Sequence, residues 1–223
     1  AFSRFARERA LPLETGVIIE LARRRDIPVF QLEREPLAGY FNTGVRVRPN
    51  GLLILGHGKY SHVLDGTFCV DRAGEYLHAL LKNPGQRLDL LKQLGIPATQ
   101  TGNDGVAGNK VFHLLIVNGR VTAIRQAKGG ELCVVEEVHE SLSGMCRAIH
   151  AQAACAAITV SLTAASLSLP LSQTGGGVID FNCAPDLEQL FGQCAGAQHL
   201  LETAAGDLLD WLFSGIGPVS VPL

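Results

Sequence analysis

The stretch TGGGVIDFNCAP, residues 174–185, gives the clearest indication of the fold. Its three glycines predict a turn that leads into a short apolar strand carrying Asp180 and Asn182. Side chains alternate along a strand, so residues two positions apart point to the same face. A carboxylate and an amide carbonyl then converge on one point, which is how proteins hold Mg²⁺ beside phosphate groups. The alternative is an ordinary hairpin strand whose polar face is solvated.

The composition is that of a folded globular protein. Of the 223 residues, 47% are hydrophobic and 18% charged, enough for one domain or two small ones. A net charge of −2 without a basic run argues against a nucleic-acid surface. No apolar segment of membrane-spanning length and no signal peptide is found, so we expect a cytoplasmic protein. The six cysteines lack CxxC spacing and are expected to be reduced core residues.

The N-terminal half is predicted to mix short helices and strands. Helical periodicity covers residues 12–25, where three arginines at the end suit the helix dipole. The Pro-Asn-Gly turn at 49–51 predicts a hairpin between 45–48 and 52–55. The other expected elements are a turn and buried strand at 26–32, a strand at 63–69, and helices at 72–81 and 84–94.

The C-terminal half is predicted to form an antiparallel sheet with helices, an α+β pattern. Asn118-Gly119 is a type I′ turn signal between strands at 111–117 and 121–125. Residues 167–171 are expected to pair with the strand at 177–182. The other expected elements are a strand at 132–135, a helix at 139–154, a strand at 157–164, and a helix over 187–213 interrupted near 192–196.

These motifs, in this order, resemble the ATP-grasp ligases. The similarity is closest to the cyanophycin synthetase branch and next to the ribosomal-protein glutamate ligases. The resemblance implies an ATP-grasp-like fold of reduced size, with a pre-grasp-like region at 1–98 and a grasp-like region at 99–223. It is carried by the segments 25–28, 55–60, 90–97, 118–120, 174–176 and 180–185, together with Arg125.

The departures from the family concern nucleotide binding. The Gly-Ile-Pro segment at 95–97 is followed almost directly by 106–110, so most of the nucleotide-binding subdomain, with its phosphate-binding lysine, is missing. Ser161 stands where the family carries a magnesium-binding aspartate, and the second metal carboxylate, a glutamate in the family, is Asp180. The resemblance therefore makes ATP binding doubtful and leaves Asp180 and Asn182 as weak Mg²⁺ ligands.

The resemblance also implies roles for the residues around this strand. Arg125 matches a family arginine that contacts phosphate, which makes Arg125, Asp180 and Asn182 the candidate catalytic residues. The alternative is that Arg125 caps the sheet edge or pairs with Glu131. The backbone N–H groups of Thr174, Gly175 and Gly176 are candidates to hold an acyl group, although a glycine turn between strands needs no such reason.

The loop at 56–60 is a second candidate site for substrate. His57 and Lys59 lie among glycines, which favour tight turning or the close approach of a ligand. The alternative is a surface loop with an incidental histidine. Cys183 is either a thiol nucleophile or a buried small residue. His113, His139, His150 and His199 show no metal-type spacing and are interpreted as structural.

Two functions follow from these observations. The first is a reduced ATP-grasp-type protein that acts on an amide or acyl group of an amino acid or peptide. The second is an inactive pseudoenzyme that serves as a binding or scaffold subunit. Loss of a subdomain exposes apolar sheet surface, so we expect a homodimer or a protein partner in either case.

Overall fold

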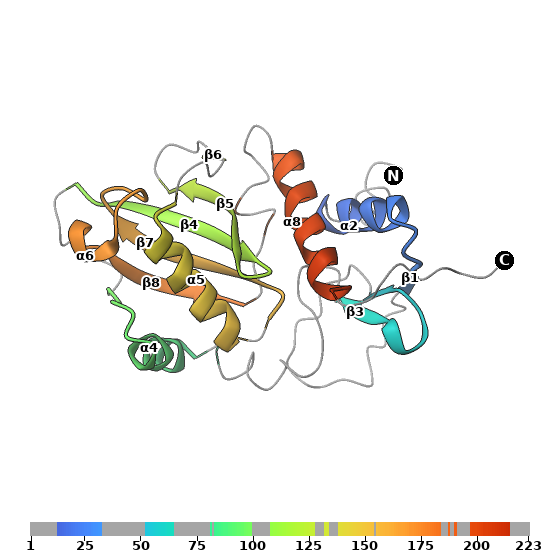
Figure 1. Cartoon of the computed structure of the whole chain (residues 1–223), viewed down its shortest axis with the longest axis horizontal. Helices are drawn as coiled ribbons and strands as arrows, with labels where there is room; N and C mark the ends of the chain where they lie inside the picture. The colour runs from blue at the N-terminus through green and yellow to red at the C-terminus, as the bar shows by residue number, and fades with distance from the viewer. Residues whose placement is uncertain are drawn as a thin grey trace, which may run out of the picture.

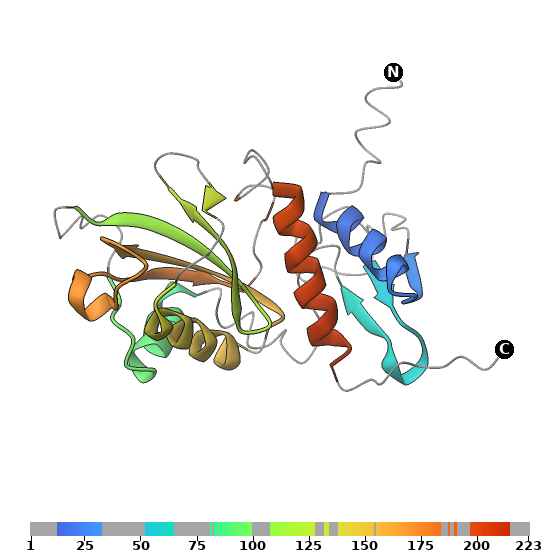
Figure 2. The ribbon, with the colours of Figure 1, turned by 45° about the horizontal axis from the view of Figure 1, so that its top comes forward.

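A computed structural model describes residues 13–32, 52–64, 81, 83–99, 108–127, 132–133, 138–153, 155–183, 187, 190 and 197–214. These residues form two antiparallel sheets flanked by helices, which confirms the predicted α+β class (Figure 1). The strand order is β1-β2-β3 in the first sheet and β6-β5-β4-β7-β8 in the second. Helix α8 (Ala197–Leu212) stands between the two sheets in both views (Figure 2).

The three-stranded sheet follows helix α2 (Leu13–Arg24), which confirms the helix expected there. Its strands are β1 (Val29–Leu32), β2 (Leu52–Leu55) and β3 (His62–Leu64). β1 confirms the strand expected at 26–32, but its expected burial is wrong, because β1 lies at the sheet edge and Phe30 is 55% exposed. β2 is the central strand, and its two edges pair with β1 and β3. The predicted pairing of 52–55 with 45–48 is therefore wrong, because a strand has only two edges to pair. Residues 45–48 themselves lie outside the described residues.

The five-stranded sheet is built around the hairpin that the sequence predicts. β4 (Lys110–Val117) and β5 (Arg120–Gln126) flank Asn118 and Gly119, whose φ angles are 51° and 69°. A type I′ turn requires positive φ at both positions, so the prediction is confirmed. The other strands are β6 (Leu132–Cys133), β7 (Ala157–Ala164) and β8 (Gly177–Asn182).

The strand partner predicted for β8 is wrong. β8 pairs with β7 from Gly177 to Asn182, and residues 167–171 do not form a strand. Instead, Pro170 precedes a short helix, α6 (Leu171–Thr174). Proline lacks an N–H and has a fixed φ, so it fits the position before a first helical turn better than a sheet interior.

One face of the five-stranded sheet is apolar and is covered by α5 (Glu140–Ala153) and α4 (Pro84–Gln93). Both helices confirm sequence predictions, and the Asn83 side chain caps α4 by accepting a hydrogen bond from the Gly85 N–H. β7 shows the alternation most clearly. Ile158, Val160 and Leu162 are fully buried in this core, whereas Thr159, Ser161 and Thr163 occupy the alternate positions. The opposite face of the sheet is therefore polar along β7.

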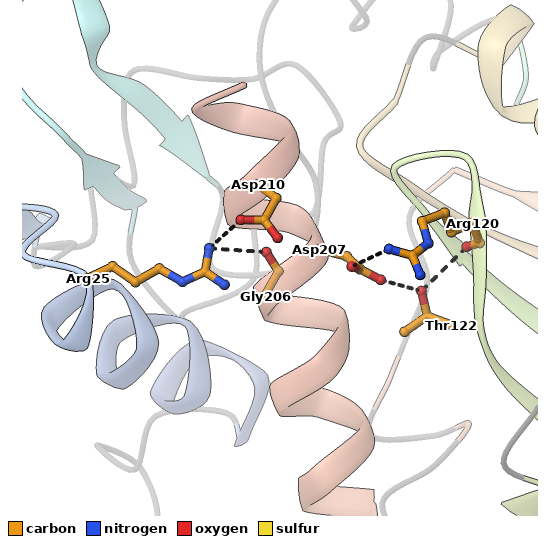
Figure 3. Close-up of polar contacts among 6 residues, drawn as sticks. All are labelled: Arg25, Arg120, Thr122, Gly206, Asp207 and Asp210. Atoms are coloured by element: carbon orange, nitrogen blue, oxygen red, sulfur yellow. Dashed lines mark hydrogen bonds and ion pairs between the residues drawn. The ribbon is translucent and has the colours of Figure 1, made fainter. Parts of the chain in front are cut away.

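Helix α8 joins the two sheets. Its buried leucines share one core with α2, with the three-stranded sheet, and with Leu115 and Val117 of β4. Polar contacts continue this junction on both sides of the helix (Figure 3). On one side Arg25 donates to Asp210 at 2.7 Å, and on the other Thr122 donates to Asp207 at 3.2 Å.

No contact of the described residues tests whether a domain boundary lies at residue 98, so this division of the chain stays a prediction. Some expected elements lie largely outside the described residues: the strand end at 65–69, the helix at 72–81 apart from Leu81, and the interruption at 192–196. Within the described residues, no helix is long and apolar enough to cross a membrane.

Candidate functional site

Four polar residues lie in one row across the five-stranded sheet. Arg125 of β5 is the Cα partner of His113 in β4, and His113 is the partner of Ser161 in β7. Ser161 is in turn the partner of Asp180 in β8. All four are partly exposed. Directly paired residues lie about 5 Å apart, so the row brings an arginine, a histidine, a hydroxyl and a carboxylate together from four strands.

The centre of the row is a hydrogen bond between His113 and Ser161. The distance from His113 Nδ1 to Ser161 Oγ is 2.9 Å. Burial lowers the pKa of His113 below its usual 6.5, and the positive charge of Arg125 lowers it further. The imidazole is therefore neutral near pH 7 and can accept the hydroxyl proton.

The interpretation of His113 as a purely structural residue did not anticipate this contact. Spacing along the chain does not reveal it, because the two residues are 48 positions apart. The available signal was the alternation in β7, where Thr159, Ser161 and Thr163 are polar and their neighbours are apolar. A strand covered on both faces has no such alternation.

Asp180 is held by an arginine that the sequence analysis also missed. Arg87 of α4 donates from Nε to Asp180 Oδ1 at 2.5 Å and from Nη2 to Oδ2 at 2.9 Å. A bidentate arginine–carboxylate pair is strong and geometrically specific. A register shift lies next to Asp180, since Ser161 pairs with Asp180 but Leu162 pairs with Val178, and such a bulge redirects side chains. Both carboxylate oxygens thus already accept hydrogen bonds from the guanidinium.

Asn182 lies two positions after Asp180 on β8 and is exposed, with Thr159 as its Cα partner. The strand expected to carry both residues is therefore confirmed, whereas their role as Mg²⁺ ligands stays a prediction. Over the described part of the chain, no group of three or more His, Cys, Asp and Glu side chains is arranged to hold a metal ion. A single carboxylate already paired with arginine does not fit a two-metal phosphate site.

Arg125 is held at the other end of the row. Its Nη1 donates to the Leu190 carbonyl at 2.6 Å, which ties β5 to the segment before α8. The alternative partner, Glu131, lies outside the described residues. Because Arg125 is the Cα partner of His113, its positive charge lies close to the His113–Ser161 pair and contributes to the lowered pKa of His113.

The glycine turn before β8 has a packing explanation. Thr174 ends α6 and is buried, and Gly175 adopts a left-handed conformation with φ 63°. A Cβ on Gly176 would overlap the Thr163 carbonyl oxygen, so only glycine fits there. These contacts account for the turn without a ligand. Binding of an acyl group by Thr174, Gly175 and Gly176 stays a prediction.

The loop with His57 and Lys59 belongs to the other sheet. It joins β2 to β3 through the short 3₁₀ helix η1 (Gly58–Tyr60), and both side chains are exposed. Lys59 Nζ lies 4.9 Å from the centre of the Tyr60 ring. A Cβ on Gly56 would lie 2.5 Å from the Tyr60 carbonyl oxygen, so this glycine is explained by the tight turn. The two sets of predicted site residues thus sit in different sheets, on opposite sides of α8 (Figure 1).

Three described cysteines are buried thiols, as expected of reduced core residues. They are Cys146, Cys155 and Cys183. Burial raises the pKa of Cys146 to about 12. A hydrogen bond from Cys155 lowers the pKa of Cys183 against the opposing effect of burial. The buried position favours the structural interpretation of Cys183 over that of an open nucleophile.

Comparisons with known proteins give little further guidance. No protein-family model matches the sequence, and a search of curated proteins finds no similar sequence. Among solved structures, the chain is similar to the macrocyclase MdnB from Microcystis aeruginosa MRC. The identity is 11% and the TM-score 0.48, over 91% of this chain and 95% of that chain. A TM-score below 0.5 does not establish a common fold, so the function has to be argued from the residues of this chain.

Proposed function

We propose that this chain is a reduced ATP-grasp-type protein that acts on an amide or acyl group of an amino acid or peptide, with conventional ATP-dependent ligation impaired. The observation that carries the proposal is the polar row of Arg125, His113, Ser161 and Asp180. Three of its four positions are those at which the resemblance to ATP-grasp ligases expects phosphate and metal contacts. The likeness to cyanophycin synthetases in particular rests on the sequence motifs alone.

The same row explains why ordinary ligation is impaired. Phosphorylation of a carboxylate needs two cations to neutralise the developing charge. Ser161 supplies a hydroxyl that is bonded to His113, and Asp180 is paired with Arg87. A cation bound by Asp180 and Asn182 would compete with the guanidinium of Arg87, so we expect weak Mg²⁺ binding at most.

The Arg87–Asp180 pair also favours a second candidate, an inactive subunit that binds a partner. In that case the ion pair replaces the metal and stabilises the sheet edge, and no substrate is turned over. A homodimer or a protein partner is proposed for both candidates. Light scattering over micromolar concentrations tests this point, and a strictly monomeric particle would contradict it.

Calorimetric titration with ATP·Mg²⁺ and with ADP tests the nucleotide half of the proposal. We expect no strong binding to the wild-type protein. In Arg87→Met the Asp180 carboxylate is released, and Mg²⁺ binding should become stronger if Asp180 is a ligand. Asp89→Asn, which removes a carboxylate from the exposed side of the same helix α4, is the matched control. Tight ATP binding that Asp180→Ala abolishes would show that the nucleotide site is intact and would contradict this half of the proposal.

Product analysis tests the catalytic half. The protein is incubated with amino acids, dipeptides and their esters, with and without ATP·Mg²⁺, and new or lost amide bonds are followed by mass spectrometry. We expect turnover that does not depend on ATP and that Arg125→Gln reduces. A folded protein without turnover under any of these conditions would favour the inactive subunit.

A further inference from the structure

Two serine–histidine pairs are present in the described structure, and their settings differ. His139 and Ser141 lie at the start of α5, with Nδ1 and Oγ 2.7 Å apart. The same Nδ1 accepts the backbone N–H of Ser141, so this exposed pair caps the helix. His113 and Ser161 face each other across two central strands, where no helix end needs a cap. The second pair therefore needs another explanation.

The face around Ser161 also carries an unexplained hydroxyl. Thr159 is two positions before Ser161 on β7, on the same face, and is 6% exposed. Its Oγ1 is buried, and none of the described residues forms a hydrogen bond with it. An unsatisfied buried hydroxyl costs free energy that a bound polar group can recover. Ser161 and His113 remain partly exposed beside it. The polar face thus combines a partly exposed hydroxyl, a base and a buried hydroxyl that lacks a described hydrogen-bond partner.

We propose that Ser161 and His113 form a nucleophile–base pair that accepts an acyl group from an activated ester or thioester. Ser161 Oγ attacks the carbonyl carbon, and its proton passes to His113 Nδ1. The bond from carbon to the leaving oxygen or sulfur breaks, and the leaving group takes the proton from His113. An amine or a water molecule then attacks the acyl-serine, the bond to Oγ breaks, and Oγ regains a proton through His113.

The neighbours of the pair suit this chemistry. Arg125 is the Cα partner of His113, so its positive charge lies beside the pair and can stabilise negative charge on the carbonyl oxygen. Asp180, on the other side of Ser161, is neutralised by Arg87 and does not oppose an anionic intermediate. Arg125 and the Arg87–Asp180 pair are the charged groups that flank the pair along the described row.

This inference deepens the proposed function by naming its acyl donor, but it does not need nucleotide. Ser161 can therefore remain unacylated while an amino-acid ligand still binds, and it can be acylated in the absence of ATP. The probe is p-nitrophenyl acetate. We measure release of p-nitrophenolate by absorbance and locate the acetyl group by mass spectrometry of proteolytic peptides.

We expect acetylation of Ser161 in the wild-type protein. Ser161→Ala should lose the adduct, and His113→Gln should slow acetylation about 100-fold, the low end of what a general base contributes. His139→Gln and Ser141→Ala are matched controls and should leave the rate unchanged. Ser161→Cys, close in size, should move the acetyl group to the new sulfur and shows that loss in Ser161→Ala is not misfolding.

A pH profile separates a catalytic base from a structural neighbour. Because the pKa of His113 is lowered, the acetylation rate should fall toward acid pH with a midpoint below 6.5, the ordinary value for histidine. Acetylation confined to residues other than Ser161, or an equal rate in folded His113→Gln, would overturn the proposal. So would the absence of an acetyl adduct at position 161 in both the wild-type protein and the Ser161→Cys variant.

Discussion

Removing the carboxylate of Asp180 should destabilise the protein more than an ordinary surface charge change. In Asp180→Asn the two charge-assisted hydrogen bonds from Arg87 become at most one neutral bond. The Arg87 side chain is 16% exposed and Asp180 49% exposed, so the pair lies between the surface and buried cases. Exposed pairs contribute about 0–1 kcal/mol, and breaking a buried pair costs about 3–5 kcal/mol. We expect a loss of about 1.5 kcal/mol, or about 3–6 °C in melting temperature.

The control is a carboxylate on α4, the helix that carries Arg87. Asp89 Oδ1 lies 3.4 Å from Lys92 Nζ, and the Asp89 and Lys92 side chains are 58% and 65% exposed. Asp89→Asn should cost no more than about 0.5 kcal/mol. Arg87→Gln should cost more than Asp180→Asn, because Arg87 also donates from Nη1 to the Leu81 carbonyl at 2.7 Å.

Urea unfolding followed by circular dichroism measures these differences, with the midpoint and slope fitted separately. The measurement is repeated in about 1 M salt, which screens exposed pairs more than partly buried ones. Equal destabilisation by Asp180→Asn and Asp89→Asn would refute the reasoning. It would mean that the Arg87–Asp180 pair is no stronger than a solvated surface contact.

Three further outcomes follow from the packing. Gly176→Ala should cost about 3 kcal/mol because its Cβ would meet the Thr163 carbonyl oxygen, whereas Gly144→Ala, which meets nothing within 4 Å in α5, should gain about 0.5 kcal/mol; thermal melts compare them. Asp207→Asn should lower stability by less than about 1 kcal/mol, since its ion-pair partner Arg120 is exposed to solvent. A double-mutant cycle of Arg120 and Asp207 measures the contribution of this pair. Burial lowers the pKa of His150 in the folded protein. The contribution of the neutral side chain to stability is therefore complete above about pH 6.5, the ordinary pKa, and is lost as the pH falls toward the folded-state pKa. Urea titrations at several pH values should show a smaller loss of stability in His150→Gln.

The sequence predicts elements whose signals are local. The type I′ turn needs only Asn118 and Gly119, because their tolerance of positive φ fixes the hairpin. Helix α4 needs only the Asn83 cap and a proline in the first turn. Strand pairing is harder to predict from the sequence. The partner of β8 depends on the apolar surface of β7 as a whole, and not on which segment lies nearest in the chain.

The candidate site divides in the same way. Asp180 and Arg125 follow from motifs, and the strands that carry them are where the sequence places them. His113 and Arg87 do not follow from motifs, because their roles arise from register across β4 and β7 and from the packing of α4 on β8. Contacts between distant segments decide which polar residues meet, and no single stretch of sequence encodes them.

The position of α8 has a consequence for the order in which the chain acquires structure. The buried side chains of the three-stranded sheet share a core with α8, which the ribosome makes only after the whole five-stranded sheet. Leu53, Leu55 and Leu64 therefore have no complete core while the nascent chain is still growing. The five-stranded sheet with α4 and α5 has its own apolar core and can condense first. Limited proteolysis of ribosome-bound chains of increasing length should show protection of residues 110–182 before protection of residues 52–64.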